Sequence, residues 1–150
     1  MKIVDANVLL YAINEDAEHH EASRTWLDDA LGGSDSVGLS WIVLLAFVRL
    51  STSPRVFRSP LSSDEAMAQV QDWIAAPTAR VLSPGDRHAG ILADVIAGSG
   101  ATANLMNDAH IAALAVEHRC DVVSYDSDFG RFDGVRWKTP DELLAPKASR

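Results

Sequence analysis

The sequence predicts an α/β protein in which a parallel β-sheet is covered by helices on both faces. Short apolar runs rich in β-branched residues alternate with segments whose apolar residues recur at helical spacing, and this alternation is typical of βαβ units. The 150 residues fit one domain, since single domains usually comprise about 100–200 residues. We expect one domain over residues 1–144 and a disordered polar tail over residues 145–150.

The expected strands lie where apolar and β-branched residues cluster between turn signals. They cover residues 2–5, 37–40, 79–82, 121–125 and 135–137. The first strand leads into a helix for which the side chain of Asn7 suits the N-cap. Further helices are expected over residues 19–31, 41–50, 62–75, 84–96, 104–117 and 140–144. Ser62 and Glu65 form a capping box for one of them, and Pro84 opens another at its first position.

The composition is that of an ordinary soluble protein. Hydrophobic residues make up 47% and charged residues 23% of the chain, and no apolar run approaches the ~18–20 residues that a membrane span needs. The first apolar run contains Asp5 and Asn7 and follows no basic segment, so it does not read as a signal peptide and we expect a cytoplasmic protein. The single cysteine, Cys120, excludes an internal disulfide and a cysteine-based zinc cluster.

The formal net charge of −8 argues against a broad basic face that binds nucleic acid, because phosphate contacts need lysines and arginines. It does not exclude a nucleic-acid substrate. Metal ions held by carboxylates reverse the local charge and become the largest charges in their site.

Carboxylates follow two of the predicted strands directly. Asp5 ends the first strand, and Asp126 and Asp128 come after residues 121–125. In an open parallel sheet the ligand site lies beyond the carboxyl ends of the strands, where the strand order reverses, so these acids should meet at one edge. Each acid taken alone is more often a turn or cap residue.

A fourth acid, Asp108, lies within the helix expected over residues 104–117. It continues a face of small side chains formed by Ala112 and Ala115, and Asn104 lies one turn before it on the same face. The helix can therefore approach the strand ends closely and bring Asp108 to the other acids. His110 is two residues further on, about 200° around the helix, and should point away from them.

Three or four converging acids repel one another unless a cation holds them together. Hard oxygen ligands of this kind suit Mg²⁺ or Mn²⁺, with positions left open for water and substrate phosphate. Such a site supports the hydrolysis of a phosphodiester by metal-activated water.

Four segments over nearly the whole chain form a pattern in this order and spacing. They are Asp5-Ala-Asn7-Val-Leu-Leu-Tyr11, the helix over residues 41–49 with the Thr52–Phe57 segment after it, Asn104–His110, and Ser124-Tyr-Asp126-Ser-Asp128-Phe129. The pattern resembles the PIN-domain family, and specifically the toxin ribonucleases of VapBC toxin–antitoxin systems. The resemblance implies an α/β/α sandwich with a short parallel sheet, Mg²⁺- or Mn²⁺-dependent endoribonuclease activity, a cognate antitoxin that covers the active site, and homodimers that assemble into larger complexes.

The resemblance also assigns roles to individual residues. By position, Asp5, Asp108 and Asp126 match the catalytic, metal-binding acids of the family, with Asp128 as a fourth metal ligand. Supporting polar positions that orient ligands or bound water are Asn7 and Ser124, with Asn104 beside Asp108, and candidate contacts to RNA are Arg49, Arg55 and Arg58.

The chain departs from the family pattern at Ala46. The family usually places a glutamate near this point of the central helix, whereas here Leu45-Ala46-Phe47 contains no acid. One metal ligand is therefore missing, which could weaken metal binding, leave one ion in place of two, shift the role to Asp128, or abolish activity.

Two alternatives to an active nuclease follow from the same residues. A degenerate PIN domain would bind RNA or a protein without cleaving. A phosphatase-like fold would use Asp5 or Asp126 as an aspartyl nucleophile, but no lysine follows Asp126-Ser-Asp128 at a suitable distance. The apolar segments at residues 8–13 and 41–50 exceed the needs of one core, so we expect part of them to form a dimer or antitoxin interface.

Overall fold

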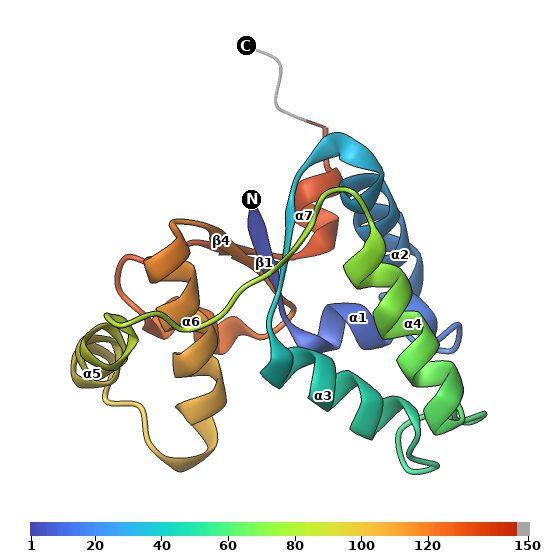
Figure 1. The fold of residues 1–150 in the computed structure, drawn as a ribbon, viewed down its shortest axis with the longest axis horizontal. Helices are drawn as coiled ribbons and strands as arrows, with labels where there is room; N and C mark the ends of the chain where they lie inside the picture. Colours follow the sequence, from blue (N-terminus) through green and yellow to red (C-terminus); the bar gives the residue numbers. More distant parts are fainter. Residues whose placement is uncertain (147–150) are drawn as a thin grey trace.

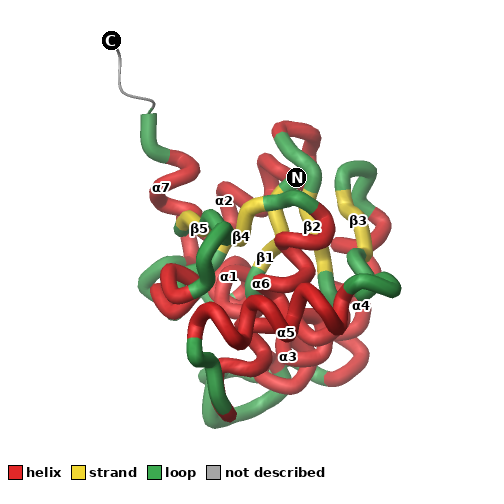
Figure 2. Tube along the Cα trace, turned by 90° about the vertical axis from the view of Figure 1, so that its left-hand side faces the viewer, coloured by secondary structure: helices red, strands yellow, loops and turns green. Residues whose placement is uncertain are grey.

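The computed structural model describes residues 1–146 and contains five short parallel strands. The strands are β1 (Lys2–Val4), β2 (Val37–Leu39), β3 (Ala79–Val81), β4 (Asp121–Val123) and β5 (Trp137–Lys138). They lie side by side in the order β3-β2-β1-β4-β5, and every neighbouring pair is parallel. Figure 2 shows this row of strands behind α5 and α6.

Seven α-helices within the described residues connect and cover the strands. They are α1 (Ala6–Ile13), α2 (His20–Asp29), α3 (Trp41–Ser51), α4 (Ser63–Ala75), α5 (His88–Ser99), α6 (Met106–His118) and α7 (Pro140–Leu144). Three shorter turns are η1 (Ala30–Ser34), η2 (Ala103–Leu105) and η3 (Ser127–Arg131). No helix within residues 1–146 is both long enough and apolar enough to cross a membrane.

The helices form a layer on each side of the sheet. Figure 1 shows α5 and α6 on one side of β1 and β4, and α1, α2, α3, α4 and α7 on the other. The three central strands are accordingly buried on both faces: Ile3, Val4, Leu39, Val122 and Val123 are all fully inaccessible to solvent. The predicted α/β/α sandwich with a short parallel sheet is confirmed.

Local sequence signals fix several helix ends as expected. The capping box of Ser62 and Glu65 is present at the start of α4. Thr139 and Glu142 form a second capping box at α7, where Pro140 occupies the first turn. In both cases side chains satisfy backbone N–H groups that have no partner inside the helix.

Three expected helix starts are wrong. The N-cap of α1 is Asp5 and not Asn7, because the carboxylate of Asp5 accepts the Ala6 N–H at 2.8 Å. Helix α5 begins at His88, four residues after Pro84. Helix α6 begins at Met106, since residues 103–105 form the turn η2 and Ala103 has a φ of 35°, which interrupts a regular helix.

The two apolar segments expected to exceed the core differ in the structure. In α1, Val8, Leu9 and Leu10 are buried within this chain. In α3, by contrast, Trp41 and Leu45 remain 46% and 62% exposed. Of the two segments, α3 is therefore the one that exposes large apolar side chains for an interface. The predicted tail over residues 145–150 lies largely outside the described residues.

Candidate metal centre

The acids meet where the order of the sheet reverses. The chain runs from β1 outward through β2 to β3, and then returns to place β4 on the other side of β1. Helices α1 and α2 after β1 lie on one side of the sheet and α5 and α6 before β4 lie on the other, which leaves a crevice at the carboxyl ends of these two strands. Asp5 directly follows β1, and Asp126 lies three residues beyond the end of β4.

Asp5 is fixed by hydrogen bonds to both of its carboxylate oxygens. Its Oδ1 accepts the Ala6 N–H at 2.8 Å, and its Oδ2 accepts the Ser124 hydroxyl at 2.7 Å. The side chain is only 8% exposed. Burial raises the pKa of Asp5, while the hydrogen bonds from Ser124 and Ala6 oppose this and the charge of Asp126 adds to it.

Ser124 and Asn7 connect the ends of β1 and β4. The fully buried Ser124 hydroxyl donates to Asp5 and accepts from the Asp126 N–H at 2.9 Å and the Asn7 amide at 3.1 Å. Asn7 in turn accepts the Tyr125 N–H at 3.2 Å. This network holds the segment after β4 against the start of α1. The structure therefore brings the side chains of Asn7 and Ser124 into hydrogen-bonding contact with Asp5.

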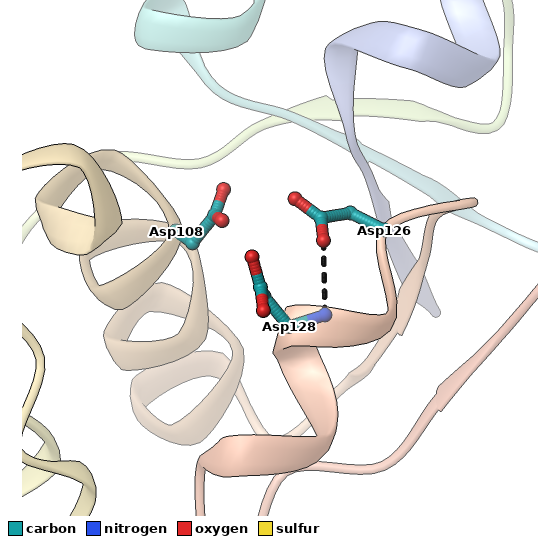
Figure 3. A group of neighbouring side chains, drawn as sticks. All are labelled: Asp108, Asp126 and Asp128. Carbon is teal, nitrogen blue, oxygen red and sulfur yellow. Dashed lines mark hydrogen bonds between the residues drawn. The ribbon is translucent and has the colours of Figure 1, made fainter.

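Three carboxylates face a common space between α6 and η3 (Figure 3). Asp108 projects from the first turn of α6, Asp126 from the segment after β4, and Asp128 from the start of η3. One oxygen of each lies within 4.8 Å of the others. The Asp126 Oδ1 accepts the Asp128 N–H at 2.9 Å, so its second oxygen remains directed at the common space.

Helix α6 can approach because its inner face is small. Ala109, Ala112 and Ala115 are buried, and α6 packs against β1, β4 and η3. Alanine side chains allow the backbone of the helix to lie close to the sheet, as the spacing of Ala112 and Ala115 predicts. Asp108 is thereby brought to the edge where β1 and β4 end.

The pKa of Asp108 reflects its burial and the acids around it. Its pKa is raised from 3.8 to about 7, first by burial and then by the charges of Asp5, Asp126 and Asp128. Like charges that share a site disfavour each other's ionisation. Within the part of the chain that the structure describes, Asp108, Asp126 and Asp128 are the group that could hold a metal ion, and their oxygen donors suit a hard divalent cation.

A pocket of about 170 Å³ opens beside these acids and faces α3. It is lined by Asp5, Ala6, Ile42, Val43, Ala46, Asn107, Asp108 and Ile111. Ala46 is thus at the site, where the missing acid would have projected, and it contributes only a methyl group. Asp128 reaches the acids from η3, on the opposite side from α3.

The asparagine beside the acids is Asn107 and not the expected Asn104. Asn104 is exposed in the turn η2 and lies outside the residues that line the pocket. The expectation required a continuous helix from residue 104, in which Asn104 and Asp108 would share a face, but α6 begins only at Met106. The spacing of Asn107 and Ile111, four residues apart, would have predicted that they share the face of α6 that lines the pocket.

His110 points away from the acids, as its position on the helix predicts. Its Nδ1 lies 3.0 Å from Nε2 of His88 on α5, and burial and the neighbouring His88 lower the pKa of His110. The pair of histidines connects α6 to α5.

The three arginines proposed to contact RNA do not lie together. Arg49 lines a hollow along α3 that also includes Ala46 and Asn107. Arg58 lines a separate hollow formed by the end of α1 and the segment after α3. Arg55 is exposed in that segment. Arg49 is therefore the one of the three that the structure places next to the acid pocket.

The fold agrees with a comparison of the sequence with known families. The profile of the PIN domain family matches residues 2–135. The chain therefore belongs to the PIN-domain family, as the sequence pattern predicted.

Comparison with individual proteins points to one group within this family. The chain is 60% identical over 144 residues to the Ribonuclease VapC37 of Mycobacterium tuberculosis, which covers 96% of this chain and all of that protein. It is 39% identical to Ribonuclease VapC31 of the same organism over 140 residues, which cover 93% of this chain and 99% of the relative. These relatives are VapC ribonucleases, the group that the sequence pattern singled out.

Solved structures support the fold. VapBC2 from Rickettsia felis, bound to a DNA fragment from its promoter, superposes with a TM-score of 0.68 at 15% identity and covers 92% of this chain and 97% of its own. The FitAcB structure from Neisseria gonorrhoeae gives a TM-score of 0.64 at 22% identity and covers 95% of this chain and 100% of its own. At these identities the likeness concerns the architecture alone.

Proposed function

We propose that this chain is a metal-dependent endoribonuclease and the toxin of a type II toxin–antitoxin system. The observation that carries the proposal is the convergence of Asp108, Asp126 and Asp128 within 4.8 Å at the edge of the sheet, with Asp5 beside them. The relatives named as ribonucleases cover nearly the whole chain, so their activity is the first to test here. We assign the nuclease to one domain over residues 1–144, acting in the cytoplasm.

The donor set fits Mg²⁺ or Mn²⁺. Oxygen ligands alone, with room left for water and phosphate, are what these ions require. Burial raises the pKa of Asp108, and the charges of the neighbouring carboxylates add to this. A divalent cation would offset those charges. A bound divalent ion would supply a water of lowered pKa and would stabilise the charge that develops on the phosphodiester.

The residues of this site have separate roles. Asp108, Asp126 and Asp128 would hold the ion, and Asp5 would complete the negative charge from the α1 side. Ser124 and Asn7 keep Asp5 and the segment before Asp126 in position through their hydrogen bonds. We expect cleavage to leave a 5′-phosphate and a 3′-hydroxyl.

Asp128 is our candidate for the acid missing at Ala46. Its oxygen belongs to the same group as those of Asp108 and Asp126. The Arg131 guanidinium donates to its Oδ1 at 3.1 Å and leaves the other oxygen unpaired by that contact. A site completed from η3 would still provide three carboxylates for one ion, so activity does not require an acid on α3.

The partner we propose is an antitoxin that covers this site, in an assembly built on a homodimer. Two of the structural neighbours are described as a VapBC assembly and as a toxin–antitoxin complex from Klebsiella pneumoniae. The exposed apolar residues of α3, next to the acid pocket, offer a surface for such a contact.

Cleavage of RNA by purified variants tests the nuclease. We expect the parent to cleave single-stranded and structured RNA with Mg²⁺ or Mn²⁺ and to stop in EDTA. Asp126→Asn and Asp128→Asn should each reduce the rate by about a hundredfold or more, since each removes a charged ligand of the ion. Asp72→Asn, an exposed position on α4, is the matched control and should cleave like the parent.

Two results would decide against this function. If Asp5→Ala or Asp126→Asn cleaves as fast as the parent, the acids are not the catalytic site. If the parent binds RNA but does not cleave it with either ion, the chain is a degenerate PIN domain that acts by binding, which is the alternative that the alanine at position 46 favours.

A further inference from the structure

The acid pocket continues into a second, larger hollow along α3. This hollow of about 460 Å³ is lined by Ile42, Leu45, Ala46, Val48, Arg49 and Asn107. Ile42, Ala46 and Asn107 also line the acid pocket. The two hollows therefore lie side by side and share part of their lining, and we call the larger one the α3 groove.

The lining of the α3 groove is apolar with two polar groups. Ile42 and Ala46 are one turn apart on α3, and Arg49 follows Ala46 by three residues, so all three occupy neighbouring positions on one side of the helix. Leu45 adds an apolar side chain that is 62% exposed. Asn107 faces them from α6. A site of this kind offers a flat apolar contact, an amide that can both donate and accept, and a cation at its outer end.

Ala46 lies where the α3 groove borders the acid pocket. Its methyl group lies in both linings, so any longer side chain at this position would project between them. A carboxylate there would also add a negative charge to a wall that is otherwise apolar. The absence of an acid at position 46 thus does more than remove a ligand, since it leaves only a methyl group where the linings of the acid pocket and the α3 groove meet.

We propose that the α3 groove is a nucleobase subsite that binds one unstacked base of the RNA next to the scissile phosphate. This inference rests on the proposed nuclease function. The apolar wall of Ile42, Leu45 and Ala46 contacts the face of the base, Asn107 reads its edge, and Arg49 contacts an adjacent phosphate. Proteins recognise single-stranded RNA by holding splayed bases in this way, with apolar contact to the face and hydrogen bonds to the edge.

The position of the groove favours RNA over a protein as its occupant. It lies beside the pocket that Asp5 and Asp108 line, where the strand to be cut has to lie. Arg49 complements the charge of a phosphate, whereas the acids at the other end suit a cation that bridges to the next phosphate.

Ala46→Leu tests the subsite because it fills the groove without changing any charge. The substrate is a single-stranded oligoribonucleotide that the parent cleaves at one site, together with versions that carry an abasic nucleotide at each flanking position in turn. We expect one abasic position to slow cleavage by the parent about tenfold or more, the order of magnitude for loss of one base contact. Ala46→Leu should cleave the intact oligonucleotide about as slowly, with no further loss at that abasic position.

Binding measurements make the test independent of cleavage. Fluorescence anisotropy of the same oligonucleotides should show the same pattern of affinities for the parent and for Ala46→Leu. Titration calorimetry with Mn²⁺ should give equal affinities for both proteins, since the three carboxylates are untouched. Ala68→Leu makes the same change at an exposed position of α4 and should behave like the parent in every assay.

The edge contact has its own variant. Asn107→Ala should retain most of the affinity for the preferred oligonucleotide but should discriminate less among the four bases at the position that the abasic series identifies. Equal discrimination by parent and variant would remove Asn107 from the proposal.

The outcomes separate the subsite from the nuclease. If the parent cleaves RNA but every abasic version costs Ala46→Leu as much as it costs the parent, the subsite is wrong and the nuclease stands. If the parent binds RNA without cleavage and Ala46→Leu loses the base-dependent part of that binding, the subsite stands and the nuclease is wrong. If Ala46→Leu leaves RNA binding and cleavage unchanged but alters the oligomeric state, the groove is a protein interface.

Discussion

At the scale of single residues, the electrostatics of the site centre on Asp108. Its carboxylate is half-buried beside three other acids, and its pKa rises to about 7 as a result. A chain that unfolds releases Asp108 to an ordinary pKa near 3.8. The folded protein without metal therefore binds a proton at Asp108 between about pH 4 and pH 7 that the unfolded chain does not bind.

This difference predicts how stability changes with pH in the absence of metal. Because the folded state binds the extra proton, the contribution of Asp108 to stability falls as pH rises from 4 through 7 and stays low above that. His110, whose pKa is lowered, acts in the opposite direction, so the effect is measured as a difference between parent and Asp108→Asn. In EDTA we expect Asp108→Asn to gain in melting temperature over the parent between pH 5 and pH 8.

The expected gain is on the order of 1 kcal/mol, or about 2–4 °C, after allowance for solvent screening at a half-exposed group. Mn²⁺ should raise the melting temperature of the parent at pH 8 and leave that of Asp108→Asn nearly unchanged. A constant difference between the two proteins from pH 5 to pH 8 would show that the acids do not repel one another in the folded chain.

At the scale of elements, the packing of β2 depends on Gly38. A Cβ at this position would lie 2.6 Å from Cδ1 of Leu82 and 3.4 Å from Cα of Ile3 on the neighbouring strand β1. Gly38 and Leu82 are both buried, so the leucine has little room to move. The glycine is thus required by close approach within the core, which a sequence pattern for strands does not reveal.

Gly38→Ala should accordingly destabilise the protein. Overpacking of a core typically costs about 1–3 kcal/mol, which corresponds to a fall in melting temperature of about 3–10 °C for a chain of this length. Gly90→Ala is the matched control, since the exposed Gly90 lies within α5 and a Cβ there meets nothing within 4 Å. That variant should be stabilised by about 0.5–1 kcal/mol, because alanine loses less backbone freedom in a helix. Equal melting temperatures for Gly38→Ala and the parent would show that Leu82 can move aside at no cost.

At the scale of the whole molecule, the apolar surface of α3 predicts self-association. Trp41 is 46% exposed at the start of this helix, and Val56 is 43% exposed in the segment after it. Exposed aromatic residues of this kind often form the centre of protein interfaces. We expect the purified chain to be a dimer at micromolar concentration by light scattering.

Trp41→Glu should weaken that dimer by at least about tenfold in dissociation constant, since it places a charge at the proposed centre. Met67→Glu, at an exposed apolar position on α4, should leave the dimer unchanged. A parent that remains a monomer at every concentration tested would remove the homodimer, although an antitoxin could still use the same surface.

Much of the fold follows from the sequence alone. The hydrophobic periodicity predicts the alternation of strands and helices. The helix starts at Ser62 and Thr139 are set by hydrogen bonds between residues close in sequence. The placement of Asp5 and Asp126 at one edge also follows from the sequence, because the carboxyl ends of parallel strands share an edge. The face of small residues on α6 similarly predicts the approach of Asp108.

Only the tertiary structure decides the details that depend on contacts between distant segments. The turn η2 delays the start of α6, so Asn107 takes the place expected for Asn104 at the pocket. The carboxylate of Asp5 serves as the N-cap of α1 and also accepts a hydrogen bond from Ser124, 119 residues away. Sequence spacing contains no information about such long-range partners, since they depend on how the strands are ordered.

The same division applies to the site as a whole. The sequence determined that four acids are available and that position 46 carries no acid. The tertiary structure decided that Asp108, Asp126 and Asp128 converge, and that Ala46 borders both the acid pocket and the α3 groove. The physical reason is that the sequence shows only which side chain is small. Whether a small side chain leaves a space depends on how the surrounding elements pack around it.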